Sequence, residues 1–438
     1  VPTVQNPDYF SDGFLAVQEL VNKGLILAGH DISAGGLITT LLEMCFANTE
    51  GGMEINLDKI KCDDIVKILF AENPGVVIQV ADKHKAEVKK ILEDAGVGYV
   101  KIGVPTEERH ILATLHDATY QFGIDYLRDV WYSTSYLLDR KQSMNGCAKK
   151  RFENYKQQPL EFVFDKSFTG KLSQFGLDPN RRTPSGIKAA IIREKGTNGE
   201  REMAYMLYLA GFDVKDVTMT DLISGRETLE DINMVVYCGG FSNSDVLGSA
   251  KGWAGSFLFN PKAKAALDNF YAREDTLSLG VCNGCQLMME LGLITPEDKK
   301  KGKMLHNDSH KFESNFLGVT VPMNRSVMFG SLSGSKLGIW VAHGEGKFSL
   351  PYPEDHYNVV LKYSYDEYPG NPNGSDYSVA GIASQDGRHL AMMPHLERAC
   401  FPWENAYYPL DRKEEDQITP WMEAFVNARK WVEANRKK

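Results

Sequence analysis

The sequence predicts an α/β protein with a doubly wound parallel sheet in its C-terminal part and a second α/β domain before it. Two observations predict this fold. From Ile187 onward, short apolar runs alternate with helical runs, the order of a parallel sheet covered by helices on both faces. Residues 25–96 alternate in the same way, which indicates helices packed on a sheet. A chain of 438 residues is also too long for one ordinary core.

The expected domains are 1–115 and 186–438, joined by a helical and irregular linker at 116–185. In the first domain the patterns predict strands at 25–29, 53–57 and 75–80, and helices at 37–47, 63–70 and 83–96. The linker opens with a helical run whose aromatic stripe we expect to pack against a neighbouring domain. It ends in a stretch rich in Arg, Pro and Gly that is typical of a domain boundary.

The second domain repeats strand and helix until about residue 290. Strands are expected at 187–192, 212–219, 232–240 and 276–281, and helices at 200–211 and 261–272. Asp386 and Gly387 indicate a hairpin, and an amphipathic helix runs from Pro420 to about Asn435. Parallel sheets place their sites at the carboxyl ends of strands, where the Gly239–Gly240 pair and Cys282 fall.

Composition indicates which cellular compartment and which classes of partner to expect. A net charge of −9 argues against nucleic acid as the main partner, because phosphate binding needs a clustered positive surface. Seven scattered cysteines indicate a reducing compartment, and we expect the cytoplasm. No apolar run approaches the roughly 20 residues of a membrane helix, and no signal peptide opens the chain, so we expect no membrane association.

The segment "GVCNGCQ" at 280–286 raises three interpretations of its two cysteines. A zinc site needs further ligands, and only His306 and His310 have a suitable spacing. A dithiol redox pair is compatible with a strand-to-helix position. In a nucleophile elbow, Gly280 and Gly284 permit a sharp turn that presents Cys282, and we favour this third interpretation.

In the elbow only Cys282 occupies the turn, where the positive end of the helix dipole favours a thiolate. We expect Cys285, one turn into the helix, to be a buried packing residue. A base is expected after the apolar strand "HLAMM", where His395 and Glu397 follow two residues apart. On extended backbone both side chains point the same way, so Glu397 can hold the imidazole in the tautomer that accepts the thiol proton.

A nucleophile of this kind also needs donors for an oxyanion. The backbone N–H of Asn283 provides one, and the loop "CGGFSNSD" at 238–245 provides a second through Gly240 or Phe241.

Five segments resemble the glutaminase domain of the phosphoribosylformylglycinamidine synthase family, a class I glutamine amidotransferase of purine synthesis. They are, in chain order, "CGGFSNSDVLG", "GVCNGCQ", "VAHGEGKF", "NPNGS" and "MMPHLER". In addition, "GHDISAGGL" at 29–37 resembles the ATP-binding synthetase region of the same family. The resemblance covers nearly the whole chain and implies a flavodoxin-like glutaminase domain preceded by a domain like the C-terminal part of aminoimidazole ribonucleotide synthetase.

The resemblance also implies roles for individual residues. Cys282 would attack the glutamine carboxamide with help from His395 and Glu397, and would release ammonia through a glutamyl thioester without any cofactor. Gln286 and the Phe241 loop would lie near the glutamine. The ammonia would serve the ATP-dependent conversion of formylglycinamide ribonucleotide to formylglycinamidine ribonucleotide.

In the synthetase part, the resemblance implies Asp31 as a Mg²⁺ ligand and Ser33 as an ATP contact. A carboxylate suits Mg²⁺, and a hydroxyl near a glycine turn suits phosphate. From the residues alone, Asp31 and Ser33 instead favour the capped start of a helix. The chain departs from the family at Ala34, where many relatives carry Asp, and at Leu396, where Pro is usual.

The family's formylglycinamide ribonucleotide site and glycine-rich phosphate segments are missing, so we expect a C-terminal portion whose partner is the N-terminal synthetase region of the same polypeptide. Alone it should hydrolyse glutamine weakly at most. Two alternatives stay open, a cysteine hydrolase or peptidase on the same fold and a non-catalytic nucleotide-binding module. His343 and Glu345 are expected on a turn between strands, in a loop that shapes the ammonia path.

Overall fold

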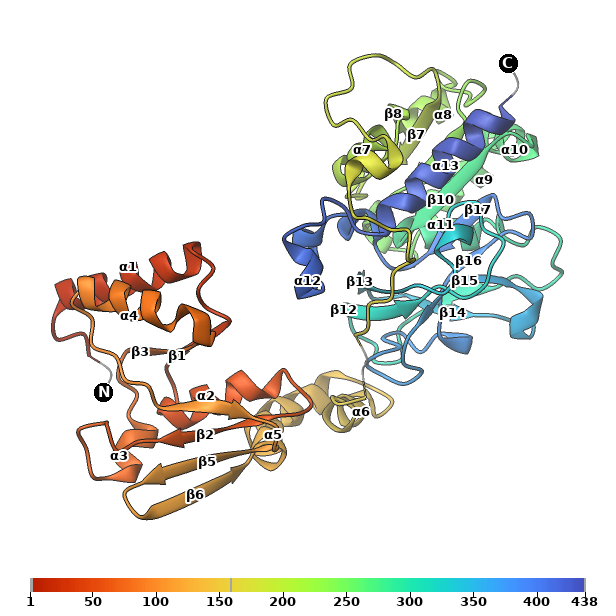
Figure 1. The fold of residues 1–438 in the computed structure, drawn as a ribbon. Coiled ribbons are helices and arrows are strands. Elements are labelled where there is room, and N and C mark those ends of the chain that lie inside the picture. The colour runs from red at the N-terminus through yellow and green to blue at the C-terminus, as the bar shows by residue number, and fades with distance from the viewer. Residues whose placement is uncertain (1–2, 158–159, 437–438) are drawn as a thin grey trace. The chain divides into compact units, whose positions relative to one another are not determined.

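The computed structural model describes residues 3–157 and 160–436, and the chain divides into two compact units, Val1–Leu137 and Leu138–Lys438 (Figure 1). The first unit holds two small sheets. In one, β1 (Ala28–Ile32) pairs antiparallel with β3 (Gly75–Gln79). The other has the strand order β4 (Gly103–Thr106), β2 (Gly52–Asn56), β5 (His110–Leu115) and β6 (Ala118–Gly123). Within it, β2 and β5 run parallel and the other pairs run antiparallel.

Each small sheet is covered by two helices that bury their apolar stripes. Buried residues of α2 (Gly36–Phe46) and α3 (Ile65–Phe70) form one core with β2 and β5. Buried residues of α1 (Pro7–Asn22) and α4 (Lys85–Asp94) form a second core, with η1 (Asp82–His84) leading into α4. The prediction of helices packed on sheet is confirmed for this unit.

The first predicted strand is displaced in the structure. It was expected at 25–29, but β1 begins at Ala28. Leu25 instead belongs to the turn that ends α1, because its N–H donates to Leu20 O at 3.0 Å across Gly24, whose φ is 65°. The apolar run 25–29 therefore contains both Leu25, which ends α1, and the first residues of β1.

The segment after β6 is helical. It forms α5 (Ile124–Gln142) and α6 (Cys147–Glu153). In the first unit, Trp131 of α5 lies 5.1 Å from the ring of Phe46 and donates to Glu43 at 2.8 Å, so this part of the aromatic stripe packs on α2.

The second unit is built on one nine-stranded mixed sheet. Its strands, in spatial order, are β13 (Lys336–His343), β12 (Glu313–Thr320), β15 (Asn358–Tyr363), β16 (Val379–Ala383), β17 (His389–Met392), β10 (Leu277–Val281), β9 (Met234–Tyr237), β7 (Lys188–Arg193) and β8 (Asp213–Thr218). The five strands from β17 to β8 are parallel, and the four from β13 to β16 add to them antiparallel. A separate antiparallel pair joins β11 (Lys303–Leu305) to β14 (Lys347–Ser349).

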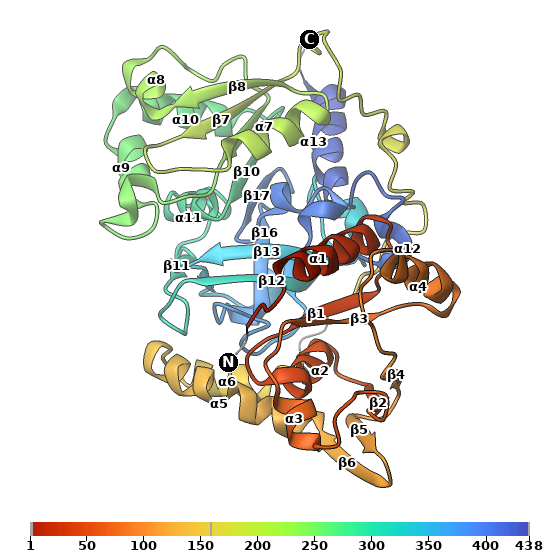
Figure 2. The ribbon, with the colours of Figure 1, turned by 90° about the vertical axis from the view of Figure 1, so that its left-hand side faces the viewer.

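Helices cover both faces of the parallel half. α7 (Glu200–Leu209) and α13 (Trp421–Asn435) contact each other on one face. The other layer consists of α8 (Met219–Ser224), α9 (Lys251–Leu258), α10 (Pro261–Ala272) and α11 (Asn283–Glu290), which are linked by mutual contacts (Figure 2). The predicted doubly wound domain is thus confirmed, with an antiparallel extension that was largely unpredicted.

Short elements complete the second unit: η2 (Leu172–Phe175), η3 (Ser242–Asp245), η4 (Gly330–Leu332), η5 (Glu354–His356), η6 (Asp376–Ser378), η7 (Leu396–Arg398), η8 (Pro402–Glu404) and α12 (Leu410–Lys413). The predicted hairpin at Asp386–Gly387 joins β16 to β17. All seven cysteines are free thiols. Across the described residues, none of the helices combines the length and the apolar character needed to cross a membrane.

Candidate active site

Cys282 occupies a strained turn between a strand and a helix. It follows the last residue of β10 and precedes the first residue of α11, with φ 54° and ψ −107°. A non-glycine residue adopts such a conformation only where the surrounding structure holds it. Here the Cys282 N–H donates to Met392 O of β17 at 2.9 Å. The predicted elbow is present, and Cys282 itself carries the strain.

The two glycines beside it have a different role from the predicted one. Neither Gly280 nor Gly284 has a positive φ, so they do not supply the turn. A Cβ on Gly284 would lie 2.0 Å from Tyr237 O, and one on Gly280 would lie 2.5 Å from Gly284 O. The glycines therefore allow α11 to approach β9 and β10 closely, which fixes the height of Cys282 above the sheet.

His395 and Glu397 form a buried pair just after β17. Nδ1 of His395 lies 2.6 Å from Oε1 of Glu397, and the two residues are 2% and 1% exposed. Burial opposes a charge on His395, but the Glu397 carboxylate and the Cys282 side chain outweigh it and raise the pKa of His395 to about 10. Burial likewise opposes the charge on Glu397, and the His395 charge outweighs it, so the pKa of Glu397 is lowered. The pair is an imidazolium–carboxylate pair.

The His395–Glu397 pair lies next to the Cys282 thiol, and Gly239 packs against both His395 and Cys282. A Cβ on Gly239 would lie 2.8 Å from Cε1 of His395 and 3.4 Å from Cβ of Cys282, so both side chains rest against Gly239. Because Glu397 occupies Nδ1, the other ring nitrogen, Nε2, is left for the Cys282 thiol. The Sγ atom of Cys282 also lies 3.5 Å from Ala342 O.

Cys285 is separated from this chemistry by burial. It is 0% exposed inside α11, and burial raises the pKa of its thiol well above the usual range. A thiol kept protonated in a dry core is a poor nucleophile. Cys285 is therefore a packing residue in the structure, as expected.

Asn283 and Gln286 connect three segments around the elbow. The Asn283 amide donates to Gln286 Oε1 at 2.8 Å and accepts from the Ser242 N–H at 3.0 Å. The Gln286 amide donates to Glu345 O at 2.8 Å. The start of α11, the 238–245 loop and the loop after β13 are thus tied together.

Of the two oxyanion donors considered in the 238–245 loop, the geometry favours Gly240. The Phe241 N–H already donates to Gly196 O at 2.8 Å, whereas the Gly240 N–H makes no backbone hydrogen bond within the described chain. Gly240 has φ 124°, and a Cβ there would lie 2.5 Å from Thr197 Cα, so only glycine fits. The N–H of Asn283, at the start of α11, has no helical partner and faces the same end of the sheet.

An acidic residue missing from the sequence prediction also lies at this end. Asp245 Oδ1 is 3.4 Å from the Asn283 amide, and burial together with the nearby Glu345 carboxylate raises the pKa of Asp245. Glu345 Oε2 is 3.4 Å from the Ser249 N–H. Only the motif "GGFSNSD" could have suggested Asp245, because the Asn283 amide and the Glu345 carboxylate beside it come from distant segments.

Asp31 and Ser33 lie in the first unit, on and just after β1. The Asp31 side chain is 71% exposed and lies 3.4 Å from Nδ1 of His30, and Ser33 is exposed. Gly35 is the N-cap of α2 and no side chain caps this helix, so the alternative of a capped helix start is wrong. In the described part of the chain no three His, Cys, Asp or Glu residues gather into a metal site.

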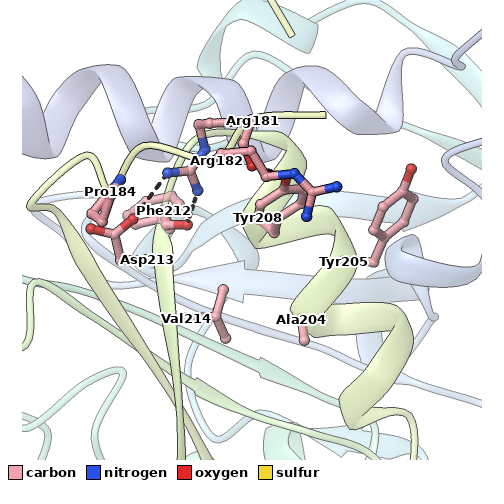
Figure 3. Close-up of a pocket in the computed structure, with 9 residues that line it drawn as sticks. All are labelled: Arg181, Arg182, Pro184, Ala204, Tyr205, Tyr208, Phe212, Asp213 and Val214. Carbon is pink, nitrogen blue, oxygen red and sulfur yellow. Dashed lines mark hydrogen bonds and ion pairs between the residues drawn. The ribbon is translucent and has the colours of Figure 1, made fainter. Parts of the chain in front are cut away.

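A surface hollow of about 490 Å³ lies at the amino end of β8 (Figure 3). Arg181 pairs with Asp213 at 3.0 Å on one side of it, and Tyr205 and Tyr208 line another. The Cys282 elbow lies instead at the carboxyl end of β10, and no predicted site residue lines this hollow.

Comparison with known proteins decides the family. Residues 186–432 match the CobB/CobQ-like glutamine amidotransferase domain, which is more than half of the chain. The chain belongs to this amidotransferase family. Residues 10–116 of the amidotransferase match a second family, the C-terminal domain of AIR synthase related proteins.

Curated relatives of the amidotransferase carry the name that the motifs indicated. A probable phosphoribosylformylglycinamidine synthase of Arabidopsis thaliana is 38% identical over 99% of the chain and 32% of its own length. The phosphoribosylformylglycinamidine synthase of Homo sapiens is 37% identical over 98% of the chain and 34% of its own length. The chain thus spans about a third of the length of these relatives. The structure of PurLQS from Thermotoga maritima is 27% identical, covers 56% of this chain and 99% of that chain, and has a TM-score of 0.44.

Proposed function

We propose that Cys282, His395 and Glu397 are the catalytic triad of a glutaminase that releases ammonia from glutamine. The observation that carries this proposal is the buried His395–Glu397 pair, 2.6 Å apart, beside the strained Cys282 turn. A cysteine paired with an oriented histidine is an activated nucleophile. The amidotransferase family of the domain favours glutamine as substrate over a peptide, and catalysis over a purely structural nucleotide-binding role.

The geometry supports glutamine hydrolysis through a glutamyl thioester, with His395 as the group that carries each proton. His395 Nε2 holds the proton of the Cys282 thiol, and Cys282 Sγ attacks the carboxamide carbon. The N–H groups of Asn283 and Gly240 stabilise the oxyanion. His395 then returns the proton to the amide nitrogen, the C–N bond breaks, and ammonia leaves a glutamyl thioester. Water, deprotonated by His395, releases glutamate. Gln286 and the Phe241 loop border the glutamine, and this half-reaction needs no cofactor.

We further propose that the chain is the C-terminal portion of a phosphoribosylformylglycinamidine synthase. The relatives that bear this name support the proposal. The ammonia would then serve the ATP-dependent conversion of formylglycinamide ribonucleotide, together with the N-terminal region of the same polypeptide. The domain division into 1–115, 116–185 and 186–438 belongs to this proposal, as does a reducing compartment such as the cytoplasm, which the free cysteines support.

Asp31 and Ser33 would contribute to Mg²⁺ and ATP in that longer enzyme. Both residues are exposed and come shortly before α2, an 11-residue helix, in the chain, and hard oxygen donors suit a metal–phosphate group. The other Mg²⁺ ligands would come from other residues, since Asp31 is the only carboxylate predicted as a metal ligand.

The test compares glutamine hydrolysis by the Cys282→Ala and Cys285→Ala variants, measured as glutamate and ammonia released. We expect Cys282→Ala to lose at least about a thousandfold in kcat. Cys285→Ala, the matched control one helical turn away, should stay within a few-fold of the wild type. Equal losses in both variants, or a loss only in Cys285→Ala, would overturn the proposal.

A further inference from the structure

His343 is a buried residue whose chain neighbours touch the catalytic groups. It ends β13 and is 2% exposed. Three residues before it, Trp340 O accepts from the His395 N–H at 2.9 Å, and Ala342 O lies 3.5 Å from Cys282 Sγ. The segment from 340 to 343 therefore runs along the Cys282–His395 pair, and the side chain of His343 has no part in the mechanism above.

Strand register places the imidazole on the face of the sheet that carries α11. His343 pairs with Glu313 on β12, and Val319 of β12 pairs with Tyr363, so alternation puts these side chains on one face. Burial raises the pKa of Tyr363, and the nearby Cys282 acts in the same direction, so this is the face on which α11 begins. The charge of His395 in turn acts on His343.

The hydrogen bonds of Asn307 define the tautomer of His343. The Asn307 Nδ2 group donates to His343 O at 2.7 Å and to Lys311 O at 3.0 Å. The Gly346 N–H donates to Asn307 Oδ1 at 3.0 Å, so the amide orientation is fixed and Oδ1 is an acceptor. His343 Nδ1, 3.2 Å from this oxygen, must therefore carry the hydrogen.

The ring stays neutral and presents a bare lone pair at Nε2. Burial, reinforced by the His395 charge, lowers the pKa of His343 to about 3. Nε2 is buried and meets no donor among the residues that the structure describes. A buried acceptor without a donor is costly to keep, so beside a reactive thiol it indicates a donor that arrives with the ligand.

We propose that Nε2 of His343 accepts a hydrogen bond from the carboxamide nitrogen of glutamine and then from the departing ammonia. The inference rests on the glutaminase function proposed above. The carboxamide N–H groups are the only neutral donors of glutamine near its reacting carbon. The charged α-ammonium group is better matched to the carboxylates of Asp245 and Glu345, near Gln286. His343 is therefore a catalytic residue that holds the leaving nitrogen.

No proton is transferred to or from His343 in this role. His395 Nε2 gives its proton to the nitrogen, the C–N bond breaks, and the electron pair of that bond stays on nitrogen. His343 accepts one N–H as a hydrogen bond throughout. The nitrogen therefore carries three hydrogens and its lone pair, and the leaving group departs as neutral ammonia.

The experiment compares two substrates, L-glutamine and the γ-methyl ester of L-glutamate, with the 438-residue chain. The ester reacts at the same carbon, but the atom that leaves carries no hydrogen to donate. We expect His343→Leu to lose about tenfold or more in kcat/KM for glutamine and to stay within about threefold for the ester. His343→Gln, which restores an acceptor, should recover part of the glutamine activity.

The matched control is His389→Leu. His389 is also a buried histidine of the same sheet, 5% exposed, but it lies at the other end, with Nδ1 3.0 Å from Ser278 Oγ. Its loss should lower the melting temperature without changing the ratio of the two activities. If His343→Leu loses both activities equally, or neither, the inference is wrong and the glutaminase stands. If the wild type hydrolyses neither substrate and a chloroketone analogue of glutamine does not label Cys282, the proposed function fails as well.

Discussion

The carboxylate of Glu397 lies 2.6 Å from Nδ1 of His395, and both side chains are almost completely buried. In this environment each charge depends on the other, because neither is solvated by water. The contact also fixes which ring nitrogen faces Cys282. Orientation and charge of the base therefore both depend on Glu397.

Replacing Glu397 with Gln should impair catalysis strongly. The amide keeps the shape of the carboxylate, but it removes the charge that favours the imidazolium and can hold the wrong tautomer. We expect kcat for glutamine to fall by about 10²–10⁴. Steady-state kinetics measures this, with Glu423→Gln as the control, because Glu423 accepts a hydrogen bond from Ser331 away from the triad. A loss of less than threefold would contradict the assigned role of Glu397.

The same pair predicts how stability depends on pH. The pKa of His395 is raised from 6.5 to about 10, so the folded chain keeps a proton that the unfolded chain releases. Its stabilisation is complete below pH 6.5 and is lost as pH rises through about 10. The lowered pKa of Glu397 has the opposite sense, and its contribution is lost as pH falls below 4.5.

Urea unfolding of the wild type and Glu397→Gln between pH 6.5 and 10 tests this dependence. Without the carboxylate, burial should keep His395 neutral, so the folded variant does not hold the extra proton that stabilises the wild type. The stability difference between the two proteins should shrink as pH rises. A difference that stays constant over this range would show that His395 is not charged in the folded chain.

Gly284→Ala should damage both stability and activity. The added methyl group would lie 2.0 Å from Tyr237 O, a backbone atom that cannot move without shifting β9. We expect a loss of about 3 kcal/mol or more and a glutaminase activity that falls as α11 moves Cys282. Gly330→Ala is the control, since a Cβ there meets nothing within 4 Å, and its unfolding free energy should change by about 0.5 kcal/mol at most. Equal effects of the two variants in urea unfolding would refute the close-approach argument.

Arg151→Ala should destabilise the second unit. Arg151 of α6 lies 2.6 Å from Asp139 and 3.1 Å from Glu313, whose side chains are 8% and 2% exposed. Its removal leaves two buried carboxylates with less compensation, which costs about 3–5 kcal/mol. The exposed Lys264–Asp268 pair provides the control, and Lys264→Ala should cost about 0.5 kcal/mol or less. The prediction is contradicted if urea unfolding shows that both variants lose only about 0.5 kcal/mol or less.

The sequence predicted the parallel half of the sheet well, for a local reason. β9 and β10 are short runs in which every residue is buried, so their apolar patterns are visible without knowledge of their neighbours. Apart from the β16–β17 hairpin, most of the antiparallel half was not predicted, because it buries polar residues. Glu313 of β12 pairs with Arg151, and Nδ1 of His343 of β13 bonds Asn307, and both partners are distant in the sequence.

The candidate site divides in the same way. The positions of Cys282 and His395 followed from their places at strand ends. The extended backbone expected from His395 to Glu397 was wrong, because Leu396–Arg398 forms the 3-10 turn η7 that brings the carboxylate to the imidazole. The role of Gly284 did not follow from its place in the sequence, because it depends on Tyr237, which belongs to another strand. The tautomer of His343 could not be predicted either, since it rests on three hydrogen bonds of Asn307.

The central claim is that Cys282 is the nucleophile that attacks glutamine. It is tested most directly by treating the chain with a chloroketone analogue of glutamine and mapping the adduct by mass spectrometry. Simple alkylation should reach Cys62 first, because it is the one cysteine that is not buried. The account predicts one adduct per chain on Cys282, absent in Cys282→Ala and retained in Cys285→Ala. An adduct on Cys285, or label spread over several cysteines, would contradict it.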